Sequence, residues 1–320
     1  MLLSYAQFMR DRYAYVIVSS LILGIAVGIF TPAPGQFIKN FSIPLIVIMI
    51  GAMGFTITLK ALKRAAQDWT AFGLGMILNF IFAPLLCWLL ALLFLKDNAQ
   101  FAIGLILIGV VPCAGMALVW AGLLKGDVPL TTVINAATMI IAPFLIPFLI
   151  QFFAGTFVRI DSLAMFKTVM LTVLIPVIAG IFLREITEQF MEVNKYLPFM
   201  PALSATAAVF IMFMAVNTGL PIILKNIQAI GPLLIATVMV FPILFLIAYF
   251  IGRTFLNRAK NIAITFSSGM KNLPIALGIA AISFQTLAML PVAVAFAFQM
   301  LTAVFFYQFF LRTLSSGENT

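Results

Sequence analysis

The chain has 320 residues, of which 64% are hydrophobic and 8% are charged, and its formal net charge is +9. A soluble domain of this size needs far more charge to cover its surface, so the composition excludes a soluble globular protein. The basic residues are spread over short connections, so the positive charge does not indicate nucleic acid as a partner.

Apolar runs follow one another along the whole chain. About 20 apolar residues suffice to cross the hydrocarbon of a bilayer. We therefore expect an all-α integral membrane protein, a single membrane domain over 1–320, with ten transmembrane helices at 14–30, 41–59, 70–95, 101–124, 129–154, 164–184, 197–219, 229–252, 260–285 and 288–311.

The basic residues predict the orientation of these spans. If the spans alternate in direction, twelve Lys and Arg residues fall on one side and five on the other. Positive residues are retained on the cytoplasmic side. The count predicts a multi-pass protein of the bacterial inner membrane with both termini in the cytoplasm.

The two halves of the chain resemble each other weakly. The tripeptide GIF at 28–30 recurs at 180–182, and Pro112 and Pro274 lie at comparable places in the fourth and ninth spans. Five spans per half is an odd number, so the second half must be inserted upside down. We expect inverted repeats over 14–154 and 164–311, a common build of secondary transporters.

The fourth and ninth spans are predicted to be broken. Pro112 and Gly115 interrupt one span, and Gly269 and Pro274 interrupt the other. Proline removes a helix hydrogen bond, and the freed backbone needs a partner from protein or water. A matched pair of breaks predicts a binding site at mid-membrane whose half-helix N-termini attract anions. The alternative is two kinked helices that only pack.

Lys271 is the one charged residue deep inside a predicted span. A lysine at the bilayer centre costs about 2.5–3.5 kcal/mol on insertion scales. It should therefore face a cavity, where it is neutral or is paired with backbone carbonyls or an anionic ligand. The alternative is a lysine that reaches the membrane surface.

Several polar residues inside the spans are candidates for binding substrate or an ion, and individually each could instead join two helices. Cys113 is a candidate soft ligand, although a lone buried cysteine is usually a small hydrophobe. The other candidates are Asn272, Asn79, Ser267, Ser268, Thr131, Asn135, Thr56 and Asn217.

Four segments carry a family resemblance: MGFT at 53–56, NFIFAP at 79–84, the stretch 112–127, and GMKN at 269–272. Together they resemble the bile acid:sodium symporter family and the related arsenite efflux permeases. The resemblance implies a panel of helices 14–30, 41–59, 164–184 and 197–219. It also implies a core of 70–154 and 229–311 in which the broken helices cross, with substrate between panel and core.

The chain departs from that family where sodium would bind. Ser267 stands in place of a glutamate and Lys271 in place of a glutamine. We therefore expect degraded sodium sites, no metal and no cofactor, with Lys271 replacing a sodium ion.

The predicted function is secondary transport of a small organic anion, bile-acid-like or another carboxylate. We expect it to be sodium-independent or linked to H+. The alternative is an arsenite or antimonite efflux permease that uses Cys113. An enzyme is not expected, because no span contains His, Asp or Glu, and a channel is the third class.

Overall fold

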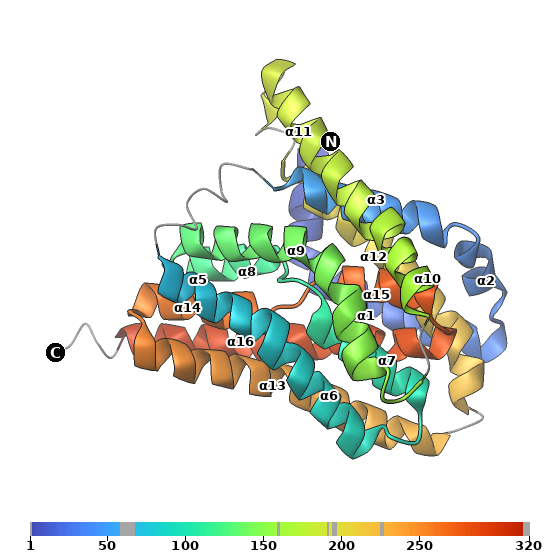
Figure 1. The fold of residues 1–320 in the computed structure, drawn as a ribbon. Coiled ribbons are helices and arrows are strands. Elements are labelled where there is room, and N and C mark those ends of the chain that lie inside the picture. The colour runs from blue at the N-terminus through green and yellow to red at the C-terminus, as the bar shows by residue number, and fades with distance from the viewer. Residues whose placement is uncertain are drawn as a thin grey trace.

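The computed structural model describes residues 2–57, 68–158, 161–190, 192–193, 197–224 and 227–315. Over these ranges the chain is helical, and an isolated bridge between Cys113 and Lys271 is the only strand-like pairing (Figure 1). Residues 58 and 59 of the predicted second span lie outside the described residues.

The first half of the chain ends with the long helix after the first break. Its elements are α1 Leu2–Phe30, α2 Ala33–Lys39, α3 Ser42–Phe55, α5 Trp69–Ile77, the π-helix η2 Leu78–Phe82, α6 Ala83–Phe94, α7 Ala99–Val110, α8 Met116–Leu123 and α9 Val128–Ala154.

The second half also ends with a long helix that follows a break. Its elements are α10 Ser162–Val169, the π-helix η3 Met170–Leu174, α11 Ile175–Phe190, α12 Phe199–Leu224, η5 Ile227–Ala229, α13 Ile230–Phe255, α14 Arg258–Gly269, α15 Leu273–Ser283, η6 Thr286–Ala288 and α16 Met289–Ser315.

The protein is a multi-pass membrane protein. Among the described residues, seven continuous helical runs are long and apolar enough to cross a membrane. An eighth is added if α2 and α3, which meet at a bend of 61°, form one span. Helices α7 and α15 are apolar, but each is too short to cross alone.

Helical structure also covers the segments that precede the first and second predicted spans. Helix α1 begins at Leu2 rather than at residue 14, because Ala6 and Met9 pack against Ala202 of α12. The segment before the second span, predicted as a connection, forms α2. Pro34 lies in its first turn, where the missing N–H breaks no helix hydrogen bond.

The helices pack in two groups. Helix α12 contacts α1, α2 and α3, and α3 also packs along α11. In the other group, α13, α14 and α16 lie side by side (Figure 1), and α9 contacts α5, α7 and α8. Helix α15 contacts α3 and α12 of the first group and α7 and α16 of the second. It therefore lies between the two groups.

Glycine allows α3 and α11 to approach closely. A Cβ atom on Gly180 would lie 2.2 Å from the carbonyl oxygen of Gly51, and one on Gly54 would lie 2.5 Å from that of Val177. Small residues at such contacts let membrane helices pack backbone to backbone. The first group is thus tightly joined around this pair.

Candidate functional site at the helix crossing

The two interruptions fall at the predicted places. Helix α7 ends at Val110 and α8 begins at Met116. Val111 is extended (φ −72°, ψ 155°), because the residue before a proline avoids the helical region. In the second half, α14 ends at Gly269 and α15 begins at Leu273.

The residues at the ends of the breaks have distinct roles. Gly115 is the N-cap of α8, and Pro274 lies in the first turn of α15. A Cβ atom on Gly269 would lie 2.3 Å from the ring of Phe245. Only glycine there lets the end of α14 pack on α13.

The two extended segments cross and pair with each other. The N–H of Ala114 donates to the carbonyl of Met270, and the N–H of Asn272 donates to the carbonyl of Pro112, both at 2.8 Å. The pairing is antiparallel, with Cys113 opposite Lys271. It satisfies backbone groups that the breaks would otherwise leave without a partner in an apolar interior.

Side chains from two neighbouring helices complete the backbone pairing. The amide of Asn135 donates to the carbonyl of Cys113 at 2.9 Å, and the N–H of Cys113 donates to the hydroxyl of Thr138 at 3.2 Å. The N–H of Lys271 donates to Oε1 of Gln299 at 2.8 Å. Helices α9 and α16 therefore hold the crossing in place.

The ammonium group of Lys271 is bound by Asn79. Its Nζ lies 3.2 Å from both the main-chain oxygen and Oδ1 of Asn79, and the lysine is fully buried (0% exposed). The bond is possible because the carbonyl of Asn79 has no main-chain donor. The N–H of Ala83 bonds to Leu78 in the π-turn, and Pro84, the next residue, has no N–H.

Asn79 also joins η2 to α14. Its Nδ2 donates to the carbonyl of Gly75 at 2.9 Å and to that of Ser267 at 3.2 Å. Among the described residues no carboxylate forms an ion pair with Lys271. Oxygen dipoles, and not an acidic side chain, surround the lysine charge.

Three groups near the crossing have weak partners or none. The hydroxyl of Ser268 is buried without a hydrogen bond in the described part of the chain, and that of Ser267 is 3.4 Å from the carbonyl of Ile264. The amide of Asn272 meets Sδ of Met139 at 3.6 Å. These groups retain hydrogen-bonding capacity beside the lysine.

The thiol of Cys113 and two helix N-termini lie at the same crossing. Cys113 is buried, with Sγ 3.4 Å from the carbonyl of Ala114. Helices α8 and α15 both begin here without a side-chain cap. Uncapped N-termini carry partial positive charge and favour an anion.

Three predicted site residues form their hydrogen bonds elsewhere. Thr131 bonds to Asp127 in the first turn of α9 at 2.9 Å, and Thr56 bonds to Met53 at the end of α3 at 2.7 Å. Asn217 spans the connection between α1 and α2, accepting from Gly35 at 2.9 Å and donating to Thr31 at 3.1 Å.

Sequence reasoning left Thr138 and Gln299 out of the site. Both accept hydrogen bonds from the crossing backbone. The available signal was position, since Thr138 follows Asn135 by three residues on one helix and Gln299 lies inside the last apolar run.

A comparison with known families shows to which family the chain belongs. The family described as Sodium Bile acid symporter family matches residues 43–226, more than half of the chain. The chain belongs to the sodium bile acid symporter family. The matched segment includes the first break and ends before α14, so Lys271 lies outside it.

Relatives of the chain include an arsenical-resistance protein and proteins named as sodium transporters. The chain is 26% identical to the arsenical-resistance protein Acr3 of Corynebacterium glutamicum, over 81% of this chain and 77% of that protein. It is 24% identical to the uncharacterized sodium-dependent transporter YocS of Bacillus subtilis, over 86% and 84%. It is 25% identical to the probable sodium/metabolite cotransporter BASS1 of Arabidopsis thaliana, over 78% and 61%.

Proposed function

We propose that this family member is a secondary transporter of an organic anion, bile-acid-like or another carboxylate, and not an enzyme. Transport is sodium-independent or proton-linked, with Lys271 in the place of a sodium ion. The observation that carries the proposal is the buried Lys271 ammonium bound to two oxygens of Asn79 where the broken helices cross.

The transport cycle proposed is alternating access. Each broken pair, α7 with α8 and α14 with α15, is one span, which brings the eight candidate spans to ten. The panel of α1, α2, α3, α10, α11 and α12 moves against the core formed by the other helices. The contacts of α15 with both groups support a boundary at the crossing.

Lys271 offers the positive charge that a sodium ion would bring. Sodium binds to several oxygens, and the ammonium group of Lys271 takes two such oxygens from Asn79. Ser267 supplies no carboxylate to hold a further cation. Deprotonation of Lys271 during the cycle then couples proton movement to transport.

The proposed substrate is anionic because the site is electropositive. Lys271 and the uncapped N-termini of α8 and α15 attract negative charge, and no carboxylate among the described residues pairs with the lysine. The hydroxyl of Ser268 and the amide of Asn272 are available to orient a carboxylate.

Purified protein in proteoliposomes tests this proposal. Uptake of taurocholate and of small carboxylates is measured with and without sodium at several pH values, after a thermal-shift screen of the same solutes. Wild-type uptake should not change when sodium is removed. Lys271→Gln should abolish uptake or flatten the dependence of uptake on pH. Lys96→Gln, which replaces an exposed lysine, is the matched control. Unchanged uptake and pH dependence in Lys271→Gln would refute the proposal.

Arsenite efflux is the second candidate function. It is favoured by the thiol of Cys113 at the crossing and by the similarity to Acr3. Direct arsenite binding that is lost in Cys113→Ser and kept in Cys87→Ser would support it. Cys87 is the matched control because it is also buried but lies in α6.

The proposed location is the inner membrane of a bacterium. The proposed orientation places both termini in the cytoplasm. The excess of basic residues on that side supports it. Fusing a reporter that is active only outside the cytoplasm to each terminus tests it, and activity of either fusion would contradict it.

A further inference from the structure

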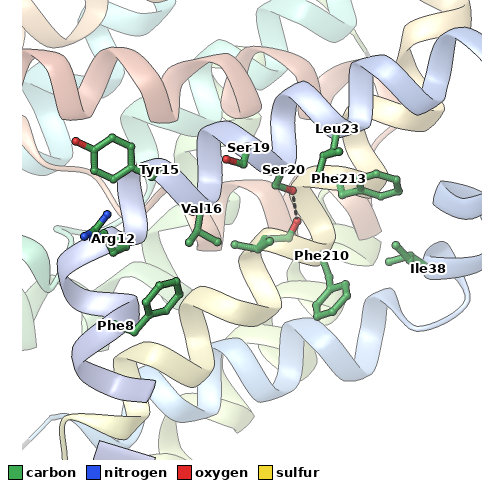
Figure 2. Close-up of a pocket in the computed structure, with 11 residues that line it drawn as sticks. Phe8, Arg12, Tyr15, Val16, Ser19, Ser20, Leu23, Ile38, Phe210 and Phe213 are labelled. Atoms are coloured by element: carbon green, nitrogen blue, oxygen red, sulfur yellow. Dashed lines mark hydrogen bonds between the residues drawn. The ribbon is translucent and has the colours of Figure 1, made fainter. Parts of the chain in front are cut away.

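An open groove lies on the outer face of the bundle between α1 and α12. Figure 2 shows it lined along α1 by Phe8, Arg12, Tyr15 and Leu23, with Phe210 and Phe213 of α12 opposite. Its volume of about 540 Å³ lies within the usual range of ligand sites. The groove is remote in sequence from both helix breaks and plays no part in the proposed transport site.

The part of the groove between Arg12 and Leu23 has the length of one membrane leaflet. Its residues on α1 recur with helical spacing and lie on one face of the helix. From Arg12 to Leu23 the helix rises about 16 Å, at 1.5 Å per residue. Half of a hydrocarbon core of about 30 Å is nearly the same length. The groove therefore reaches from the membrane surface to mid-membrane.

The chemistry of the groove is divided between its two ends. Arg12 is exposed at the surface end, and no carboxylate in the described part of the chain forms an ion pair with it. The deeper part is mainly aromatic and aliphatic. Ser20 adds no free polar group there, because its hydroxyl donates to the carbonyl of Val209 at 2.9 Å.

We infer that this groove binds one anionic phospholipid of the leaflet on the side of the N-terminus. The phosphate pairs with Arg12 through charge-assisted hydrogen bonds. One acyl chain lies along α1 from Tyr15 to Leu23 and against Phe210. A cation at the surface end and an apolar channel one leaflet deep fit this amphiphile.

Native mass spectrometry and thermal shift of the purified protein test the inference. The probes are palmitoyl-oleoyl phosphatidylglycerol and its phosphatidylcholine counterpart. Wild-type protein should retain phosphatidylglycerol in preference. Arg12→Gln should weaken phosphatidylglycerol binding about fivefold, as expected for one basic residue at a membrane surface. It should weaken phosphatidylcholine binding less, because the choline cation offsets the charge of the phosphate that both lipids carry. Ser19→Trp, at an exposed position inside the groove, should weaken binding of both lipids.

Arg253→Gln is the matched control, since it removes an exposed arginine from the last turn of α13, outside the groove. It should leave lipid selectivity unchanged. Equal phosphatidylglycerol binding by wild type and Arg12→Gln would overturn the inference. So would a protein dimer that forms in place of the lipid complex and is lost in Ser19→Trp, since a second chain would then fill the groove.

Discussion

Asn79 offers the ammonium group of Lys271 two oxygens at the same distance, 3.2 Å. One is a side-chain oxygen, and the other is a main-chain oxygen that the helix leaves free. Pro84 leaves it free, because a proline five residues after Asn79 cannot donate to it in the π-turn. Pro84, which is far from Lys271 in sequence, thus leaves an oxygen of Asn79 free to bind the ammonium group.

Pro84→Ala should weaken this arrangement. Alanine restores the N–H that can bond to the carbonyl of Asn79 and so compete with Lys271. We expect a changed pH dependence of transport, with the helix itself no less stable because alanine favours helix. The measurement is uptake against pH in proteoliposomes.

Pro176→Ala is the control for that experiment. The π-turn η3 has the same arrangement, in which Ile175 bonds to Met170 and a proline follows. It lies in another part of the chain and does not contact Lys271 through any described hydrogen bond. An equal change in both variants would show that the π-turns affect folding and not the lysine.

Replacing Asn79 tests the side-chain half of the site. Asn79→Asp places a carboxylate beside Lys271, so we expect a less active transporter, because a strong ion pair holds the lysine still. The carboxylate cannot donate to Gly75 and Ser267, and the loss of these two bonds offsets the stability gained from the ion pair. Asn79→Ala removes one acceptor of a buried charge and should lower stability by about 1.5–3 kcal/mol. Melting temperature and uptake rate, measured on both variants, distinguish the two effects. Faster uptake by Asn79→Asp would contradict the reasoning.

The sequence reveals the helix breaks better than the site around them. Proline and glycine act locally, so the interruptions at 111–115 and 270–272 follow from Pro112 and Gly269 alone. Which face of a helix a polar residue occupies depends on tertiary packing. Thr56 and Asn217 look like Asn79 in an apolar run, yet they bond at the ends of helices.

Two features were beyond pattern reasoning for specific reasons. The free carbonyl of Asn79 depends on a π-turn, which changes the hydrogen-bond register without a composition signal. Helix α1 begins at Leu2 because Ala6 and Met9, which lie in a mainly polar stretch, pack on α12, and hydropathy does not report such contacts. The fold class depends on composition and could be predicted from the sequence. The hydrogen-bond register and the packing of helices could not.

Gln299→Leu should destabilise the crossing. The N–H of Lys271 would lose its only described acceptor in a buried place, at a cost of about 1–3 kcal/mol. Thr302→Val in the same helix is the control, since its hydroxyl bonds only within α16. Melting temperatures of the two variants should differ clearly, and equal values would argue against a role for Gln299.

Arg184 should matter more than its ion-pair partner. Its guanidinium donates to the carbonyls of Phe55 and Thr56 at the end of α3, at 3.3 and 2.8 Å, and to Glu188 at 3.0 Å. Arg184→Gln should lower stability by about 1.5–3 kcal/mol, because charged donors to helix-end carbonyls are lost. Glu188→Gln should cost less than about 1 kcal/mol, since Glu188 is partly exposed. Thermal unfolding ranks the two variants, and the reverse order would show that the bonds from Arg184 to the end of α3 do not stabilise the fold.

The environment of Asp68 predicts that the folded protein loses stability in acid. This carboxylate caps α5 and pairs with Lys260 of α14. The hydrogen bond from Lys260, and then that from the N–H of Ala71, lower the pKa of Asp68 below its ordinary value of 3.8. A lowered folded-state pKa means that the stabilisation is complete above about pH 4 and is lost as the pH falls through the folded-state value.

Asp68→Asn should therefore melt lower than wild type at neutral pH, and the difference should shrink as the pH falls below about 4. The effect is modest, because about a third of each partner is exposed (29% for Asp68 and 32% for Lys260) and solvent screens the pair. Asparagine keeps an oxygen that can cap α5, so the lost term is the ion pair. Lys260→Gln should remove the same acid-dependent difference. If the gap between wild type and Asp68→Asn widened in acid, the pair would be destabilising and the assignment wrong.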